Sequence, residues 1–164
     1  MDKKLWTCEF WEKATVEIAT KALESVTDIN IRDTNSQEET LLHVAVQANT
    51  AAEVVKLLLD RGADIEACDK YKKTALYEAA ESGTPEVVTL LLDRGANING
   101  SAQRHDTPLH IAVVFNKPEL VALLLDRGAD IEARGANGET PLQYALIHGR
   151  SEMVELLRNR GARD

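Results

Sequence analysis

The four histidines are the residues best suited to acid–base or metal chemistry, and their surroundings argue against both. His43 and His110 each follow a threonine by three residues in matching segments, whereas His105 and His148 have no such motif. A nucleophilic triad needs a Ser or Cys and an orienting acid around a histidine, and no such spacing occurs. The sequence also lacks an HExxH pair, a metal-ligand cluster and a phosphate-binding glycine loop. We therefore expect no enzymatic activity, no metal and no cofactor.

The cysteines and the net charge narrow the classes of partner. Cys8 and Cys68 are far apart and form no CxxC pair, so we expect reduced thiols rather than a disulfide framework or zinc site. A net charge of −8 disfavours nucleic-acid binding. No apolar run approaches the roughly 20 residues of a membrane helix, and no secretory segment follows MDKKLW. We expect a cytoplasmic chain that binds neither nucleic acid nor membrane, with delivery into a host cell left open.

The segment LLLDRGA recurs along the chain and indicates how these residues are positioned. It occupies 57–63, 90–96 and 123–129, and returns as LLRNRGA at 156–162. The glycine of each copy lies 33 residues after the previous one. A fixed period of about 20 to 50 residues is typical of a stacked repeat array. The sequence therefore predicts a solenoid rather than a single globular core.

Each repeat reads as two short helices followed by a finger-like loop. The segments TLLHVA, TALYEA, TPLHIA and TPLQYA begin at 40, 74, 107 and 140, where the threonine predicts a helix N-cap. The first helix stops near Asn49, Gly83, Asn116 or Gly149, because Gly and Asn favour the left-handed turn. A second helix follows from Ala52, Pro85, Pro118 or Ser151. The twelve-residue loops each hold one isoleucine, and Asn137-Gly138 predicts a two-residue hairpin turn.

These motifs resemble ankyrin repeats, whose pattern is TPLHxA followed by LLLxxGADIxA. The resemblance covers Thr40 to Ala162 and implies one all-α ankyrin-repeat solenoid over residues 1–164. We expect a degenerate N-terminal repeat at 5–39, repeats at 40–73, 74–106 and 107–139, and a C-terminal capping repeat at 140–164. Three loops depart from the family pattern: Lys72 and His105 replace a glycine, and Ala102 and Gly135 replace an aspartate. Within this family the histidine of the TPLH motif braces its turn, which gives His43 and His110 structural roles.

The resemblance implies a non-catalytic module that binds a partner protein, of unknown identity, through a concave groove and the loop tips. A regulator that occludes a partner enzyme is the alternative, and a weak hydrolase or transferase is disfavoured. We expect a monomer. The candidate partner-binding residues are Lys70, Tyr71, Lys73, Glu81, Gln103, Arg104, Val114, Phe115, Arg134, Asn137, Ile147 and His148.

Two features of these candidates suggest what the partner is like. Lys70, Lys72, Lys73, Arg104 and Arg134 put positive charge along the loop tips beside Tyr71. They are either ordinary solvated side chains or a site for an acidic or aromatic partner segment. Val114, Phe115 and Ile147 stand where the family usually has polar residues. They form either an exposed apolar floor in the groove or part of the core.

Two further groups have structural interpretations. The repeated pairs Asp60/Arg61, Asp93/Arg94 and Asp126/Arg127 are interpreted as charged helix ends. Trp6, Phe10 and Trp11 are expected to cover the open end of the array, and an aromatic docking or self-association site is the alternative.

Overall fold

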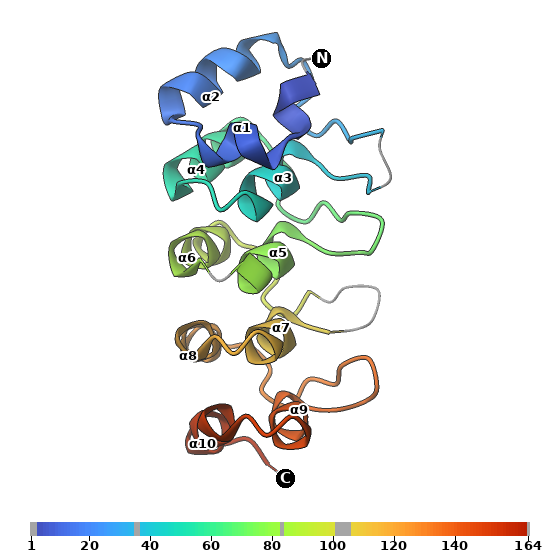
Figure 1. Ribbon diagram of the computed structural model, residues 1–164, viewed down its shortest axis with the longest axis vertical. Coiled ribbons are helices and arrows are strands. Elements are labelled where there is room, and N and C mark those ends of the chain that lie inside the picture. The colour runs from blue at the N-terminus through green and yellow to red at the C-terminus, as the bar shows by residue number, and fades with distance from the viewer. Residues whose placement is uncertain (1–2, 35–36, 83, 101–105, 164) are drawn as a thin grey trace.

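The computed structural model describes residues 3–34, 37–82, 84–100 and 106–163, which form a stack of helix pairs (Figure 1). An inner layer holds α1 (Cys8–Glu12), α3 (Leu41–Gln47), α5 (Ala75–Ser82), α7 (Pro108–Val114) and α9 (Pro141–Ile147). An outer layer holds α2 (Val16–Ala22), α4 (Ala52–Asp60), α6 (Pro85–Asp93), α8 (Pro118–Asp126) and α10 (Ser151–Asn159). Short 3-10 turns cover Lys3–Trp6 and Leu23–Ser25. The loops project together from one edge of the stack, away from the outer helices (Figure 1). The chain is thus an all-α repeat solenoid.

Local sequence signals place the helix ends. Thr40, Thr107 and Thr140 occupy N-cap positions in extended backbone, and each takes part in a capping box with the residue three positions later. The second helices begin at Ala52, Pro85, Pro118 and Ser151, as predicted. After the inner helices, Asn49 and Asn116 adopt φ values of 53° and 55°, which confirms the expected left-handed stops there. Gly83 lies outside the described residues.

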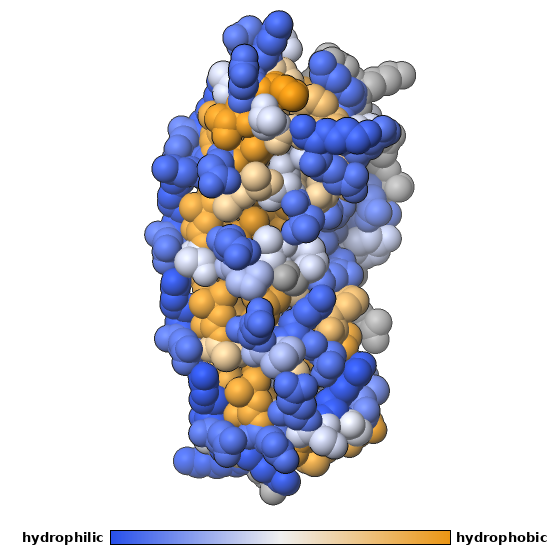
Figure 2. All heavy atoms as spheres, turned by 60° about the vertical axis from the view of Figure 1, so that its left-hand side comes forward, coloured by the Kyte–Doolittle hydropathy of each residue, from blue (hydrophilic) through white to orange (hydrophobic). Residues whose placement is uncertain are grey.

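The core runs through the whole stack because each helix pair buries its apolar face against the next pair. Neighbouring inner helices contact each other from α1 through α9, and the outer helices do the same from α2 through α10. Leu41, Leu76, Leu109 and Leu142 occupy equivalent or adjacent inner positions and are almost completely buried. On the side seen in Figure 2, hydrophobic residues form patches along the stack that hydrophilic side chains separate. No helix in the described segments is long and apolar enough to span a membrane.

The aromatic residues near the N-terminus cover the first helix pair. Trp11 is fully buried, and its indole Nε1 donates to the Leu5 carbonyl at 2.8 Å. The Phe10 ring meets Trp11 edge-on at a centroid distance of 5.1 Å, and Trp6 also packs against the core. These contacts support the covering role expected for the three aromatics.

The loop at 135–139 forms a turn different from the one its sequence predicts. The Gly138 amide donates to the Gly135 carbonyl, and the Gly135 amide donates to the Glu139 carbonyl. Gly138 has a φ of 81°, but Asn137 does not have positive φ, so the two-residue hairpin predicted at Asn137-Gly138 is wrong. A three-residue loop ending in a left-handed residue replaces it. Residues 69–73 make the same hydrogen bonds, with Lys72 at φ 62°.

The repeated Asp-Arg pairs connect consecutive repeats. Arg94 contacts Asp60 at 2.9 Å, Arg127 contacts Asp93 at 2.7 Å, and Arg160 contacts Asp126 at 2.6 Å. The residues interpreted from the sequence as charged helix ends therefore form ion pairs between neighbouring outer helices. They are partly exposed, so each contributes at most about 1 kcal/mol.

A second set of contacts between repeats lies in the loops. The side-chain oxygens of Asn30, Glu66, Asn99 and Glu132 each accept from a backbone amide of the next repeat, at 2.7 to 2.9 Å. These four residues occupy the position after the repeated isoleucine. Because each bond joins two repeats, the series holds the loops in register along the stack.

Candidate protein-binding face

The C-terminal ends of the inner helices form one face of the stack, here called the inner-helix face. Glu81 and Ser82 of α5, together with Gln47 of α3, line a pocket that loop residues Asp69 and Tyr71 complete. The ends of the inner helices therefore face the loops across a groove. By repeat spacing, the face comprises Gln47, Ala48, Glu81, Ser82, Val114, Phe115, Ile147 and His148.

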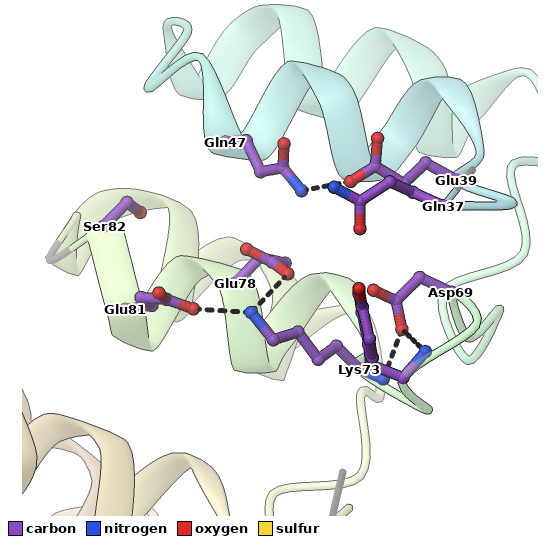
Figure 3. Close-up of a pocket in the computed structure, with 9 residues that line it drawn as sticks. Gln37, Glu39, Gln47, Asp69, Lys73, Glu78, Glu81 and Ser82 are labelled. Atoms are coloured by element: carbon purple, nitrogen blue, oxygen red, sulfur yellow. Dashed lines mark hydrogen bonds and ion pairs between the residues drawn. The ribbon is translucent and has the colours of Figure 1, made fainter. Parts of the chain in front are cut away.

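The pocket between α3 and α5 has a volume of about 460 Å³ and a predominantly polar lining (Figure 3). Gln37, Glu39 and Gln47 line it from the α3 side, and the Gln47 amide donates to the Glu39 carboxylate. The α5 side and its loop supply Asp69, Tyr71, Lys73, Glu78, Glu81 and Ser82. The lining thus contains four carboxylates and one lysine.

Lys73 extends along α5 and binds two of these carboxylates (Figure 3). Its Nζ lies 2.9 Å from Glu81 Oε2 and 3.2 Å from Glu78 Oε1, and 5.2 Å from the centroid of the Tyr77 ring. Burial by itself would lower the pKa of Lys73, but the bonds to Glu81 and Glu78 outweigh it and raise this pKa. Lys73 and Glu81, which the sequence predicted as separate partner contacts, are therefore bound to each other.

Glu78 is the most buried carboxylate of the cluster, with 6% of the residue exposed. Burial raises its pKa, and the adjacent Lys73 ammonium partly counteracts that effect. A charge in this environment is tolerated because the ammonium lies in direct contact. The cluster is thus a charged floor for the pocket, fixed in place by internal ion pairs.

The loop at 69–73 positions two of the predicted tip residues. The Asp69 carboxylate is buried and accepts from the amides of Tyr71 and Lys73, both at 2.8 Å. These bonds hold the tight turn, which leaves the Tyr71 side chain 45% exposed at the mouth of the pocket. Lys70 Nζ lies 4.8 Å from the Tyr71 ring centroid. Lys70 and Tyr71 therefore form one exposed pair at this tip.

The other predicted tip residues that the structure describes contact their own loop. Arg134 donates to the Gly138 carbonyl at 2.9 Å and to Gln143 Oε1 at 3.3 Å, so its head group braces its own loop. Asn137 is exposed and donates to Glu139 Oε1 at 3.3 Å. Gln103 and Arg104 lie outside the described residues. Lys70, Lys72 and Arg134 are exposed at the described tips, whereas Lys73 is paired with Glu78 and Glu81.

The apolar residues of α7 and α9 are on the surface, which decides between the two interpretations of them. Phe115 is 44% exposed and Ile147 is 67% exposed, while Val114 is half-buried. Leu146, which the sequence analysis did not single out, is 45% exposed. Phe115 and Ile147 therefore do not fill the core. The exposed apolar floor is the arrangement that the structure supports.

His148 lies at the end of α9, next to this apolar surface. Its ring stacks on Tyr144 at a centroid distance of 4.0 Å, and its Nδ1 lies 2.9 Å from the Tyr144 carbonyl oxygen. Because a carbonyl can only accept, Nδ1 carries the proton in this contact. His148 thus extends the inner-helix face with a flat ring stacked on Tyr144.

The two histidines of the TPLH-like motifs are structural. Nδ1 of His43 lies 2.8 Å from the Thr40 hydroxyl oxygen and 3.3 Å from the Thr40 amide nitrogen. Nε2 of His43 lies 3.0 Å from the Lys73 carbonyl oxygen. His110 repeats these contacts with Thr107 and the Glu139 carbonyl. Each Nε2 faces a carbonyl, so Nε2 donates and Nδ1 accepts. Burial lowers the pKa of both imidazoles.

The remaining chemistry-bearing groups stay apart. Within the described residues, no group of three or more His, Cys, Asp or Glu side chains is arranged to hold a metal ion. Cys8 and Cys68 are both free thiols, and burial raises the pKa of Cys8.

The sequence analysis missed the acidic lining of the pocket, namely Glu39, Asp69 and Glu78. One sequence signal could have revealed Glu78. The equivalent positions in the other repeats hold Val44, Ile111 and Tyr144, so a carboxylate there is out of place on a helix face that packs inward. Such a residue requires a partner, and Lys73, five residues earlier, supplies it.

Comparison with known proteins agrees with this architecture. A family model described as ankyrin repeats (3 copies) matches residues 10–102, and one described as ankyrin repeats (many copies) matches residues 109–158. No individual curated protein matches the sequence. The two family models together span most of the stack, including both halves of the inner-helix face. This chain therefore belongs to the ankyrin repeat family, whose repeats generally act as protein–protein interaction modules.

Proposed function

We propose that this chain is a non-catalytic module that binds a partner protein across the inner-helix face and the adjoining loop tips. The observation that carries the proposal is the exposure of Phe115 and Ile147 at positions equivalent to the pocket residues Ser82 and Glu81. Apolar side chains gathered on one face of a soluble chain mark an interaction site. Tyr71 at the pocket mouth adds an aromatic contact of the type enriched at interfaces.

The mechanism is docking onto a surface that is already formed. The Lys73 ion pairs, the Asp69 turn and the contacts between repeats hold the pocket and the loop tip in place before a partner arrives. Binding therefore loses little conformational entropy, and modest contacts suffice. A standard interface of roughly 800 Å² on each side fits the length of such a face.

The experiment compares proteins captured by the tagged chain with those captured by a Phe115→Ser/Ile147→Ser variant. We expect at least one captured protein to be lost from the variant, because the substitutions remove exposed apolar contacts. We expect the melting temperature to change by less than about 3 °C, because surface substitutions seldom exceed 0.5 kcal/mol.

A matched control makes the same kind of substitution on a different face of the stack. Val16 and Ile18 on α2 are 44% and 47% exposed, so Val16→Ser/Ile18→Ser removes similar apolar surface elsewhere. The control should retain the captured protein. If both variants capture the same set as the unchanged chain, the inner-helix face is not the binding surface. A large fall in melting temperature for the Phe115/Ile147 variant would mean that the lost capture reflects unfolding rather than a lost contact.

A further inference from the structure

The inner-helix face changes character halfway along the stack. In the row formed by equivalent positions, Gln47 and Glu81 are polar, whereas Val114 and Ile147 are apolar. The parallel row consists of Ala48, Ser82, Phe115 and His148, and Phe115 is its one large apolar side chain. The change falls between α5 and α7. The groove thus has a polar half next to the first two of these helices and an apolar half next to the last two.

The polar half carries an excess of negative charge that the chain itself does not balance. Of the charged residues lining the pocket, Glu39, Asp69, Glu78 and Glu81 are acidic and only Lys73 is basic. Asp69 is occupied by two backbone amides of its own turn, and Lys73 is shared between Glu78 and Glu81. The carboxylates of Glu39 and Glu81 are half-buried and line the open space of the pocket. An incoming cation would meet them without displacing Lys73.

The apolar half supplies an independent contact of the opposite kind. Phe115 and Ile147 are exposed there, and Val114 is half-buried. Water-exposed apolar surface of this kind gains free energy when an apolar partner side chain covers it. One occupant that satisfies both halves must therefore carry a positive and an apolar side chain.

We propose that the partner segment presents a lysine or arginine to the pocket between α3 and α5 and an apolar side chain to the Phe115–Ile147 surface. Packed helices lie about 8 to 10 Å apart, so two steps along the stack separate the two contacts by roughly 20 Å. An extended chain covers about 3.3 Å per residue, which places the two side chains about six residues apart. This inference rests on the protein-binding function proposed above and specifies its ligand.

The charge of the pocket lining, rather than that of the loop tips, favours a basic partner segment. Lys73, one of the cations that suggested an acidic partner in the sequence, is paired with Glu78 and Glu81 of this chain. The net charge of −8 also attracts a basic segment at long range. Lys70, Lys72 and Arg134 remain as exposed cations at the loop tips, and none of them lines the pocket.

The experiment selects binders from a displayed library of random twelve-residue peptides on the immobilised chain. We expect enriched peptides to contain Lys or Arg and an aromatic or large aliphatic residue about six positions away. Enrichment of acidic peptides, or of peptides without a basic residue, would overturn the inference while leaving the protein-binding function intact. If no peptide and no partner protein binds, both proposals fail together.

Charge variants then locate the basic residue. For a selected peptide we expect Glu39→Gln/Glu81→Gln to weaken binding by about tenfold, because each substitution removes a charge-assisted contact but keeps an acceptor oxygen. The matched control is Glu53→Gln/Glu86→Gln, which removes the same charge from the exposed first turns of α4 and α6. Equal weakening in both variants would mean that only net charge matters, and the pocket assignment would be wrong.

A second copy of this chain is the competing occupant of the apolar half. Sedimentation of the unchanged chain distinguishes it from a separate partner. A concentration-dependent dimer that Phe115→Ser abolishes would overturn the proposal, whereas a monomer that binds the basic peptide supports it.

Discussion

The two buried imidazoles make the stability of this chain depend on pH just below neutrality. His43 and His110 are 0% and 2% exposed, and burial lowers the pKa of each below its ordinary value of 6.5. The nearby carboxylates of Asp69 and Glu39 raise the pKa of His43, and those of Asp106 and Glu139 raise the pKa of His110. In both cases the lowering of the pKa by burial is larger. Both rings therefore stay neutral in the folded chain under conditions that protonate them in the unfolded chain.

The sign and size of the effect follow from proton binding. Because the unfolded state binds more protons below pH 6.5, the stabilising contribution is fully present above this pH and is lost as the pH falls. If both rings remain neutral at pH 5.5, each lowers the free energy of unfolding by at most about 1.4 kcal/mol relative to pH 7.5. Together they set an upper limit of roughly 3 kcal/mol, a large share of the usual 5 to 15 kcal/mol.

The assay is urea unfolding followed by circular dichroism at pH 7.5, 6.5 and 5.5. The perturbation is His43→Gln/His110→Gln, for which α9 supplies a precedent. There Gln143 occupies the same position and accepts from the Thr140 amide at 3.1 Å. We expect the unchanged chain to lose stability between pH 7.5 and 5.5, and the double variant to lose much less. An unchanged slope in the double variant would refute the assignment of this pH dependence to the imidazoles.

Two further predictions concern the loops, and both use thermal unfolding. Lys72→Gly should raise the free energy of unfolding by about 1 kcal/mol, because Lys72 has a φ of 62° that costs a side-chain-bearing residue energy; a lower melting temperature would contradict this. Gly135→Ala should destabilise the chain by about 1 to 3 kcal/mol, because its Cβ would lie 2.5 Å from Asp106 Oδ1 and 3.1 Å from His110 Nε2. Adding Asp106→Ala should recover part of that loss, and no recovery would mean that the clash lies elsewhere.

The Gly135 prediction shows how a family pattern misleads when a neighbour has changed. The ankyrin pattern has an aspartate at this position, and Asp69 is the equivalent residue in the loop at 69–73. The sequence alone therefore favours Gly135→Asp as a stabilising change. In the structure the carboxylate of Asp106, from the preceding repeat, accepts from the Ala136 amide at 3.1 Å. The Asp106 carboxylate therefore already occupies this space, and the side chain introduced by Gly135→Asp would clash with it.

The positions of the helices could be read from the sequence because they depend on residues close together in the chain. A threonine cap bonds to an amide three residues away, and Asn49 or Asn116 ends a helix through its own backbone conformation. The starts of the outer helices at Ala52, Pro85, Pro118 and Ser151 followed from the same local chemistry. The loop turn at 137–138 was less predictable, because Asn-Gly suits more than one turn type.

The chemistry of the inner-helix face was harder to foresee. Its positions were correctly aligned from the repeats, and the residue types there identified Phe115 and Ile147 as unusual. Whether they were exposed depended on how α7 and α9 stack, which no short segment specifies. The binding of Lys73 to Glu78 and Glu81 likewise depended on the path of a long side chain across α5.

By itself, then, the sequence determined the repeat period, the ankyrin architecture and the residues available on each repeat, since these depend on local spacing. Only the tertiary structure decided which charges are already paired. Asp60 and Arg94 are 34 residues apart yet 2.9 Å from each other, because stacking places equivalent positions of neighbouring repeats side by side. The same stacking gathers Glu39, Glu78 and Glu81 around one pocket, although Glu39 belongs to a different repeat from the other two.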